Sequence, residues 1–515
     1  MVKSNTRAIV LAAGRSTRFK TKKSKLLFNI CGRTMVVYPI KVLEELGIPM
    51  TVVLGYQAEE IKQDIESSKI SQVSYIVQEE QLGTGHAVAC TEKTWDRDNI
   101  LIMNGDIPLL TKELIEKLMH DHQEKEATIT FLTSLVIDPT GYGRVIEENG
   151  KISIIEEKDC TPEQRFINCI NAGIYLIKRD FLEKNISKLQ RSTVSGELYL
   201  VDLIAMASDE NHKVEAISVA YDSVRGVNTL QELWSVEQIK RSEFIKLWMA
   251  NGVRFELAQS IHIDIDVQIG AGSFIGTGVH LIGTTRIGEE CSIGAFSILS
   301  NSLVDDYSTV HSHSVIQDSK IGSHVSVGPF ARLRDNVTIG NDVEIGNFVE
   351  IKNTHIGDHA RMKHLTYLGD AKLGKSVNVG AGTITCNYNG VEKHTTIIED
   401  NAFIGSNNTL IAPVTVGAGA YTAGGSIITE DVPADSLAIG RAKQVNKIGY
   451  AKKLRDRFEK KSNNDSNNSY SKPACEQNTE KNIDQNIAQE DVEFNFRGAV
   501  KTDTDYKIDY KEEGF

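Results

Sequence analysis

The 515-residue chain has no apolar run of about 18 residues or more, so no segment has the length and composition of a membrane-spanning helix. Its first residues, MVKSNTRAIVLAAG, enter a strand-like apolar run without the apolar core and cleavage site of a secretion signal. An excess of basic residues is also missing: the net charge is −12, with no basic face interleaved with aromatics. We therefore expect a cytoplasmic protein that binds neither membranes nor nucleic acids and acts on small molecules.

Paired cysteine motifs are absent as well. The seven cysteines are scattered singly, without C-x-x-C spacing, and an odd number in a chain of this length is typical of reduced thiols. They are Cys31, Cys90, Cys160, Cys169, Cys291, Cys386 and Cys475. The sequence therefore predicts neither a zinc site nor a disulfide.

The second half contains a six-residue repeat in which glycine follows an aliphatic residue. The pairs are Ile269-Gly270, Ile275-Gly276, Ile287-Gly288, Ile293-Gly294, Ile321-Gly322, Val327-Gly328, Ile339-Gly340 and Ile345-Gly346. A period of six fits neither a helix nor a hairpin sheet, and it is typical of a parallel β-helix. In such a fold the aliphatic side chain enters a narrow core, and glycine is expected to allow a tight corner. The alternative is a sandwich domain with chance Ile-Gly pairs.

The repeat loses its glycine between the fourth and fifth pairs. The residues expected to point inward there are Ile298, Val304, Val310 and Val315. The register is kept at five or six residues, so we expect one continuous β-helix.

The first half alternates apolar runs with helical patterns, which is typical of an α/β domain with a mostly parallel sheet. The expected strands are 6–11, 50–54, 99–103 and 127–132, with helices at 36–46 and 113–122. Beyond residue 461 the chain is too polar to repay the entropy of ordering. We expect five segments: an α/β domain at 1–228, a linker helix at 229–251, a β-helix at 252–445, a basic helix at 446–461 and a mostly disordered tail at 462–515.

A small-residue turn, Ala12 to Gly14, follows the first predicted strand. Ligands bind α/β sheets at such strand ends, and small residues let backbone N–H groups approach phosphate oxygens. Arg18 and Lys25 can neutralise a polyphosphate. Asp106 ends another buried strand, where a carboxylate can hold Mg²⁺, and the loop from Gln81 to His86 offers groups suited to a base edge. Together these features predict a nucleotide site.

These motifs resemble the family of bifunctional bacterial N-acetylglucosamine-1-phosphate uridylyltransferase / glucosamine-1-phosphate acetyltransferases. The matching stretches of the first half include LAAGRSTRF, QEEQLGTGHAV, NGDIPLL, PTGYGRVIEE and RGVNTLQEL. The resemblance implies a Rossmann-like nucleotide-diphospho-sugar transferase domain followed by a left-handed parallel β-helix of hexapeptide repeats. Ser16 stands where this family usually has glycine, so we expect some strain in that turn.

The resemblance also implies a role for individual residues of the first half. Those implied to bind UTP or the sugar are Leu11, Ala12, Ala13, Gly14, Arg18, Lys25, Gln78, Gly83, Thr84, Gly143, Glu156, Asn171 and Asn228. Among them, Arg18 and Lys25 would contact the triphosphate. The uracil would be held by Gln78, Gly83 and Thr84, and the sugar by Gly143, Glu156 and Asn171. The implied Mg²⁺ ligands are Asp106 and Asn228.

Three polar segments interrupt the repeat: GPFARLR at 328–334, KHLTYLGD at 363–370 and GTITCNYNG at 382–390. They match the acetyltransferase half of the same family, in which His364 would be the general base. Imidazole suits this role, because a glucosamine amine must lose a proton before it attacks a thioester. The residues implied to hold the sugar phosphate are Arg334, Lys352, Tyr367, Asn378 and Lys393. Those implied to bind acetyl-CoA are Ala381, Asn387, Tyr388, Ser406, Gly424 and Arg441.

The predicted function is therefore acetyl transfer from acetyl-CoA to glucosamine 1-phosphate, then uridylyl transfer from UTP to N-acetylglucosamine 1-phosphate with Mg²⁺. The resemblance further implies a homotrimer with acetyltransferase sites between neighbouring β-helices. One alternative is a single-activity sugar-1-phosphate nucleotidyltransferase with a structural β-helix. Another is a non-catalytic regulatory subunit, which would predict loss of Lys25, Asp106 or Asn228; all three are present.

Overall fold

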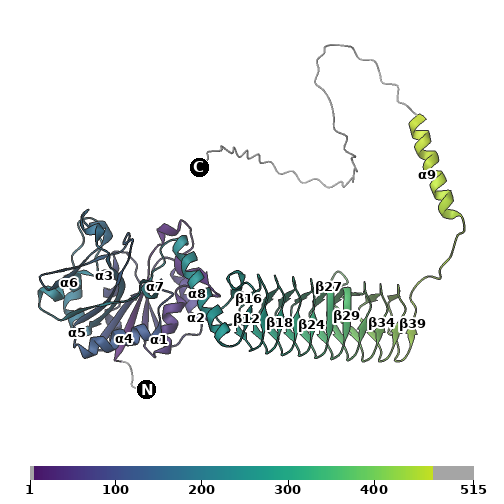
Figure 1. The fold of residues 1–515 in the computed structure, drawn as a ribbon, viewed down its shortest axis with the longest axis horizontal. Helices are drawn as coiled ribbons and strands as arrows, with labels where there is room; N and C mark the ends of the chain where they lie inside the picture. Colours follow the sequence, from purple (N-terminus) through teal and green to yellow (C-terminus); the bar gives the residue numbers. More distant parts are fainter. Residues whose placement is uncertain (1–4, 468–515) are drawn as a thin grey trace, which may run out of the picture. The chain divides into compact units, whose positions relative to one another are not determined.

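The computed structural model describes residues 5–467 (Figure 1). Their contacts separate two units, one ending at Ala442 and the other beginning at Lys443. None of the helices among these described residues is long and apolar enough to cross a membrane.

The second unit contains helix α9 (Tyr450–Asn467). It begins and ends later than the predicted helix at 446–461, so residues 462–467 are helical where a tail was predicted. The helix starts directly after Gly449, and no glycine or proline follows until Pro473, so the chain offers no residue that would end it earlier. The predicted disorder beyond residue 467 lies outside the described residues.

The first unit begins with an α/β domain whose sheet has the strand order β11-β7-β10-β6-β1-β4-β5. The strands are β1 (Thr6–Ala12), β4 (Met50–Leu54), β5 (Val73–Val77), β6 (Asn99–Asn104), β7 (Ile129–Leu135), β10 (Cys169–Lys178) and β11 (Val214–Ser218). Neighbours pair in parallel except β10, which is antiparallel to β6 and β7. The predicted mostly parallel sheet is confirmed.

Helices cover this sheet, and apolar residues fill both of its faces. The helices are α1 (Val37–Glu45), α2 (Ala58–Ser67), α3 (Thr84–Ala89), α4 (Lys112–Glu124), α5 (Arg179–Asn185), α6 (Asp202–Asp209) and α7 (Tyr221–Val224). Along β1, Val10 enters one hydrophobic cluster and Ile9 the other, as expected for a strand buried on both faces. A hairpin of β8 (Arg144–Glu148) and β9 (Lys151–Ile155) extends from β10.

Helix α8 (Leu230–Ala250) joins the α/β domain to the β-helix. The hydroxyl of Thr229 caps it by accepting a hydrogen bond from the backbone N–H of Glu232. Val236 packs into the core of the α/β domain and Ile245 into the core of the β-helix. One helix therefore contributes to both cores.

The β-helix runs from β12 (Arg254–Phe255) to β39 (Leu437–Ala438) as three ladders of short parallel strands. We call the ladder containing β12, β15 (Phe274–Ile275) and β18 (Ser292–Ile293) face A. Face B contains β16 (His280–Ile282), β19 (Ile298–Ser300) and β22 (Val315–Gln317), and face C contains β14 (Gln268–Ile269) and β17 (Arg286–Ile287). Each coil supplies one strand to each face, which gives the parallel β-helix that the repeat predicts, in the left-handed form that the resemblance implies.

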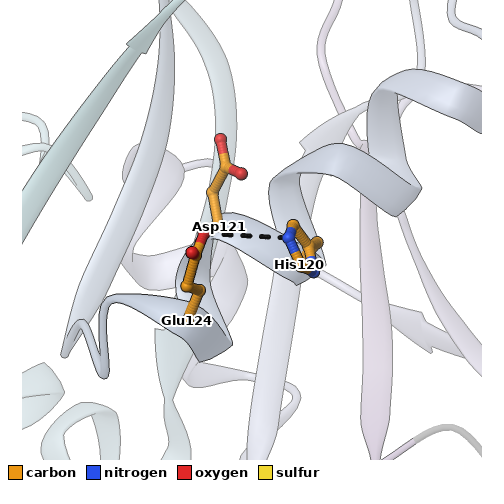
Figure 2. Close-up of side chains that lie close together, drawn as sticks. All are labelled: His120, Asp121 and Glu124. Carbon is orange, nitrogen blue, oxygen red and sulfur yellow. Dashed lines mark ion pairs between the residues drawn. The ribbon is translucent and has the colours of Figure 1, made fainter.

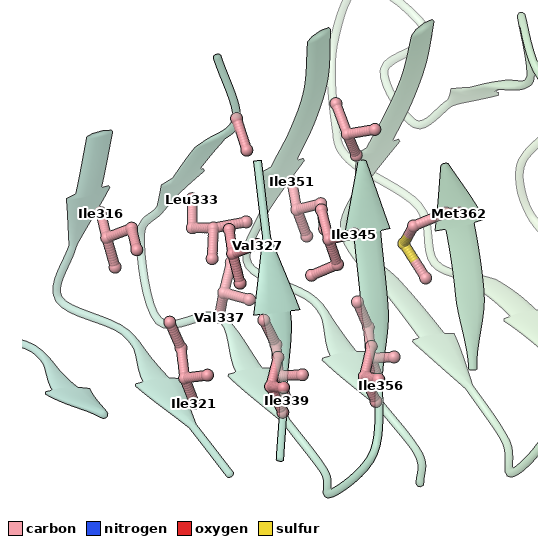
Figure 3. Packing of buried hydrophobic residues seen from close by; sticks show 14 of the residues in the cluster. Ile316, Ile321, Val327, Leu333, Val337, Ile339, Ile345, Ile351, Ile356 and Met362 are labelled. Carbon is pink, nitrogen blue, oxygen red and sulfur yellow. The ribbon is translucent and has the colours of Figure 1, made fainter. Parts of the chain in front are cut away.

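Aliphatic side chains from all three faces meet inside the coil (Figure 3). In the gap without glycine, Val304 and Val310 point inward as predicted. The prediction is wrong for Ile298 and Val315, which are exposed, while Leu299 and Ile316 are fully buried. Two adjacent aliphatic residues stand at each of these strands, so sequence spacing alone does not say which one faces the core.

The repeat glycines serve a different purpose from the one expected. A Cβ at Gly288 would lie 2.7 Å from the backbone nitrogen of Asp306 in the next coil, so close stacking of coils requires glycine there. The left-handed corners fall two residues later, at Glu290 and Phe296, for example. At these positions the glycine therefore prevents a clash between coils and another residue adopts the positive φ, whereas Gly328 itself has φ 95°.

Candidate functional site

Two adjoining cavities lie at the carboxyl ends of the central strands β1 and β6. One has a volume of about 390 Å³ and contains the turn after β1. The other, of about 300 Å³, reaches the β8–β9 hairpin region. The residues lining both are Leu11, Thr84, Asn104 and Asp106. Every residue predicted to bind UTP or the sugar lines one cavity or the other, so the sequence-predicted set is brought together.

A cationic group lies where the two cavities meet. The ammonium of Lys25 pairs with the carboxylate of Asp106 and donates a 2.9 Å hydrogen bond to Oδ1 of Asn228. The guanidinium of Arg18 donates to the same Asn228 oxygen at 2.8 Å. Carboxylate and amide oxygens thus converge on one positive charge. This arrangement of oxygens suits a hard cation such as Mg²⁺, and Gly226 leaves space beside them, because a Cβ there would still lie 3.7 Å from Asp106.

The turn after β1 is held by the side chain of Ser16. This residue has the left-handed conformation, with φ 54°, as expected where a family member would carry glycine. Its hydroxyl oxygen accepts a 3.1 Å hydrogen bond from the backbone N–H of Lys25. The neighbouring Ser24 donates its own N–H to Oε1 of Gln57 at 2.6 Å. Both serines therefore fix the segment that presents Lys25.

The predicted base-binding loop is built around a buried glutamine. Nε2 of Gln78 donates to the carbonyl of Gly83 at 3.2 Å and lies 2.9 Å from Nδ1 of His86. Gly83 has φ 108°, and a Cβ there would lie 2.8 Å from the backbone nitrogen of Leu198. The loop therefore requires glycine, and Gln78 closes it internally.

The second cavity contains a carboxylate with an altered acidity. Burial, together with the negative charges of Glu197 and Asp159, raises the pKa of Glu156 to about 6. Asn171, also nearly buried, donates to the hydroxyl of Tyr175 at 2.6 Å. Gly143 leaves room over Glu156, since its Cβ would lie 3.5 Å from that carboxylate. Polar groups suited to sugar hydroxyls therefore line this cavity.

Arg144 is a residue of this region that the sequence analysis did not single out. It is 1% exposed, and its guanidinium contacts the carbonyl of Tyr142 and donates a 2.6 Å bond to Glu157. The same Glu157 oxygen accepts the N–H of Gly141 at 3.1 Å. Because residues 141–143 line the sugar cavity, Arg144 fixes its wall. Nothing in the motif PTGYGRVIEE predicts that its arginine is buried.

Two long strands interrupt the regular coils of the β-helix. They are β27 (Glu344–Lys352) and β29 (Arg361–Gly369), which pass from face A to face B without a break (Figure 1). His364 lies where β29 turns this A/B corner, just before the left-handed Leu365. Asn347 occupies the paired position on β27, and Oδ1 of Asn347 lies 2.9 Å from Nδ1 of His364.

Several predicted acetyl-CoA residues lie at the same corner of later coils. Each stands directly before a residue with positive φ: Ala381 before Gly382, Ser406 before Asn407 and Gly424 before Gly425. The N–H of Asn407 donates to the carbonyl of Ala381, and that of Gly425 to the carbonyl of Ser406, both at 2.7 Å. The Arg441 side chain comes within 3.9 Å of a Cβ at Gly425. These residues therefore form a continuous edge with His364.

The predicted sugar-phosphate residues gather mainly at the other end of face B. Arg334, on β25 (Arg332–Arg334), is the register partner of Lys352. Lys393 lies beside Lys352, and a hydrogen bond with Lys393, partial desolvation and the positive charge of Lys393 hold the pKa of Lys352 below its ordinary value. The adjacent like charges indicate a site for an anion.

Tyr367 and Asn387 adjoin these cations. A Cβ at Gly369 would lie 2.5 Å from the Tyr367 hydroxyl and 2.9 Å from Nδ2 of Asn387. The two side chains therefore lie close together above Gly369. Asn387 also donates to Asp370, a residue without a predicted role. Tyr388 is exposed in the following loop.

Asn378 is the predicted sugar-phosphate residue that lies apart, on β31 (Asn378–Val379) of face A. The sequence did not predict that Asn378 lies on face A while the other residues of this set lie on or beside face B.

One further cluster has metal-ligand chemistry but lies on the surface of α4. His120, Asp121 and Glu124 are the only group of three such side chains found close together among the described residues (Figure 2). Nε2 of His120 is 3.7 Å from the Glu124 carboxylate, four residues on, and both side chains are exposed. This is ordinary pairing on a helix surface. It contributes nothing to the Asp106 site.

Comparisons with known proteins place these sites in context. The Nucleotidyl transferase family model matches residues 7–237, and the GMPPB C-terminal domain model matches residues 257–364. A solved UDP-glucose pyrophosphorylase complexed with UDP-glucose covers 46% of the chain and 99% of its own length at 17% identity, with a TM-score of 0.38. That similarity is too weak to add to the assignment.

Curated relatives match nearly the whole chain. The Bifunctional protein GlmU of Fervidobacterium nodosum is 41% identical over 452 residues, which is 87% of this chain and 98% of the relative. The protein of the same name from Clostridium botulinum is 41% identical over 451 residues, again 87% and 98% of the two chains. Identity of this level over this length establishes common descent and a common fold, and the chain therefore belongs to the family of bifunctional GlmU proteins.

Proposed function

We propose that this protein makes UDP-N-acetylglucosamine by two reactions at two separate sites. At the β-helix it transfers the acetyl group of acetyl-CoA to glucosamine 1-phosphate, and at the α/β domain it transfers the uridylyl group of UTP to N-acetylglucosamine 1-phosphate, releasing pyrophosphate. One observation carries the proposal: a chain with a nucleotide cavity also presents an imidazole and an anion site on its β-helix. Membership of the bifunctional GlmU family supports it.

The first site can perform uridylyl transfer by positioning and charge alone. A sugar 1-phosphate is already an anionic nucleophile, so attack on the α-phosphate needs no protein base. Arg18 and Lys25 neutralise the triphosphate, while the turn from Ala12 to Gly14 offers backbone N–H groups to its oxygens. Because the nucleotide and sugar cavities meet at Asp106, the reacting phosphates are brought to one point.

The remaining residues of the first site orient the two substrates. The loop of Gln78, Gly83 and Thr84 would hold the uracil. Gly143, Glu156 and Asn171 would hold the sugar, with the carboxylate accepting hydrogen bonds from its hydroxyls.

Mg²⁺ would be held by Asp106 and Asn228, whose oxygens already converge on the Lys25 ammonium. When bound, the ion supplies neutralisation of phosphate charge. Lys25 is then free to contact phosphate oxygens.

The second site can perform acetyl transfer through a positioned base. His364 takes a proton from the glucosamine amine, the amine attacks the thioester carbonyl, and the proton passes to the leaving thiolate of CoA. Arg334, Lys352, Tyr367 and Lys393 would hold the sugar phosphate, whereas Asn378, predicted for the same role, lies apart on face A. Ala381, Asn387, Tyr388, Ser406, Gly424 and Arg441 bind acetyl-CoA, and the Ala381 N–H and Ser406 are candidates to stabilise the oxyanion.

The acetyltransferase site is completed by a second copy of the chain, and we propose a homotrimer. Along β29, His364 is five residues from Gly369, the register partner of Lys352. At about 3.3 Å per residue a straight strand would give a separation of about 16 Å, and the corner at Leu365 makes it shorter. Because His364 and the cations lie at opposite ends of face B, we propose that the imidazole of one copy serves the cation cluster of its neighbour.

The small-molecule partners are therefore glucosamine 1-phosphate, N-acetylglucosamine 1-phosphate, UTP and acetyl-CoA. We propose a cytoplasmic location, without membrane or nucleic-acid partners. The uridylyltransferase domain would span 1–228, the linker 229–251 and the acetyltransferase domain 252–445.

One-pot product analysis tests the proposal. Protein is incubated with glucosamine 1-phosphate, acetyl-CoA, UTP and Mg²⁺, beside Asp106→Ala and His364→Ala variants. Wild type should yield UDP-N-acetylglucosamine, Asp106→Ala should accumulate N-acetylglucosamine 1-phosphate, and His364→Ala should not release CoA thiol. A wild-type protein that uridylylates supplied N-acetylglucosamine 1-phosphate but never releases CoA thiol would instead be a single-activity nucleotidyltransferase with a structural β-helix.

A further inference from the structure

Asn347 contacts the imidazole of His364 from the coil below. The two residues are register partners on the long strands β27 and β29, and Oδ1 of Asn347 lies 2.9 Å from Nδ1 of His364. An amide oxygen only accepts hydrogen bonds, so this contact requires the proton of a neutral imidazole to be on Nδ1. The lone pair of Nε2 is then free.

The backbone around this pair leaves little room for a different arrangement. A Cβ at Gly346 would overlap the carbonyl oxygen of Lys363, so β27 and β29 approach unusually closely immediately beside Asn347 and His364. Phe348 and Leu365, which follow the pair, both have positive φ. The two strands therefore turn the corner together and hold the amide opposite the ring.

The charged groups on the flanking strands are bound to other partners. On β27, the Glu344 carboxylate pairs with Arg361 and Lys363, both on the strand of His364 itself. The other carboxylate of β27, Glu350, accepts hydrogen bonds from Arg334 at 3.0 and 2.9 Å. The neutral amide of Asn347 thus faces the ring, and the acidic side chains of the strand are paired elsewhere.

We propose that Asn347 is a positioning residue for acetyl transfer: it fixes His364 as the Nδ1–H tautomer and aims Nε2 at the substrate amine. This inference deepens the function proposed above and rests on it. Asn347 acts through His364 and needs no contact with the substrate. A base of fixed tautomer and orientation avoids the loss of rate that a rotating imidazole would suffer.

Three variants of the full-length protein test the proposal. Asn347→Leu keeps the size of the side chain but removes the acceptor. Asn347→Asp keeps an oxygen in place and adds a negative charge. Ser312→Leu is the matched control, because Ser312 stands before the left-handed His313 at the same corner of an earlier coil, away from the proposed sites.

For Asn347→Leu we expect kcat of acetyl transfer to fall about 10- to 100-fold, a fraction of the contribution of a general base, with KM values nearly unchanged. Asn347→Asp should keep most of the activity and move the acid limb of the pH–rate profile to higher pH, because a carboxylate favours the imidazolium. Uridylyl transfer should be unchanged in both, and Ser312→Leu should resemble wild type. Full activity in Asn347→Leu, or an unmoved acid limb in Asn347→Asp, would overturn the proposal.

The tautomer itself can be measured without reference to activity. ¹³C and ¹⁵N NMR of histidine-labelled protein, with the His364 signal assigned from its absence in His364→Ala, should report Nδ1–H in wild type and a mixture of tautomers in Asn347→Leu. The same tautomer in both proteins would contradict the role of Asn347. If wild type fails to acetylate glucosamine 1-phosphate, the proposed function fails, while this spectrum still decides what Asn347 does.

Discussion

Ser16 combines a left-handed backbone with a hydrogen bond to Lys25, and the two have opposite effects on stability. The left-handed conformation costs about 1–2 kcal/mol for a residue with a Cβ, whereas the hydrogen bond contributes about 1 kcal/mol. Ser16→Ala loses the bond and keeps the strain, and Ser16→Gly loses both. We therefore expect Ser16→Ala to be the less stable variant and to raise the KM for UTP more. Thermal unfolding and uridylyltransferase kinetics measure the two effects, and equal behaviour of the variants would contradict the strain argument.

Glu156 should make sugar binding depend on pH. Burial, then the charges of Glu197 and Asp159, raise its pKa from 4.5 to about 6. If the carboxylate accepts sugar hydroxyls, protonation weakens binding, so KM for N-acetylglucosamine 1-phosphate should rise as pH falls through about 6. A phosphate monoester also titrates near pH 6. Glu156→Gln is therefore the control. Any pH dependence of KM that is lost in this variant is due to Glu156 and not to the phosphate.

The same shift has a consequence for stability. Because burial favours the neutral acid, the folded protein binds this proton more tightly than the unfolded chain does. The contribution of Glu156 to stability is therefore greatest below pH 4.5 and is lost as pH rises to about 6. Glu156→Gln should flatten the pH dependence of the unfolding free energy in this window. An unchanged slope would mean that the carboxyl titrates normally.

At the scale of elements, the close contact of β27 and β29 depends on one glycine. A Cβ at Gly346 would overlap the Lys363 carbonyl, and overpacking of this kind costs about 1–3 kcal/mol, or more where the backbone must move. Gly346→Ala should destabilise the β-helix and reduce acetyl transfer while uridylyl transfer persists. Gly424→Ala is the control for stability, since the nearest atom to its Cβ would be 3.5 Å away. Equal unfolding temperatures for the two variants would show that the strands can separate without cost.

The elements differ in how far their sequence predicts them. The hexad repeat predicts the β-helix because the stacking of coils imposes one inward aliphatic residue per side, seen at Ile339, Ile345 and Ile351. It does not predict which of Ile298 and Leu299 points inward, because both are apolar. Nor does it reveal that β27 and β29 run through a corner, since strand continuity depends on hydrogen bonds between coils. Asn347 contacts His364 because both strands continue through the corner and the two residues lie one coil apart.

At the scale of the whole molecule, the residues predicted for the first site line adjoining cavities, because many of them stand at the ends of neighbouring parallel strands. Asp106 and Asn228 are 122 positions apart in sequence, yet both contact Lys25. The second site is harder to predict, because its residues divide between two corners of one coil. His364 and Lys352 are close in sequence but separated by the width of face B. Sequence distance is therefore a poor guide to which residues of a β-helix share a substrate.

This division makes a prediction about the assembled protein. If His364 of one copy serves Lys352 of another, His364→Ala and Lys352→Ala chains should each be inactive in acetyl transfer but restore activity when mixed. In randomly mixed trimers about a quarter of the sites should be complete, and in trimers that contain both chains one site of the three should be complete. Co-expression of differently tagged chains, purification through both tags and assay of CoA thiol release measure the rescue. The rate of uridylyl transfer measures the total amount of protein in each assay, because neither variant alters that site. If His364 and Lys352 instead act within one chain, no mixture contains an intact pair, and co-purified trimers would remain as inactive as either variant alone.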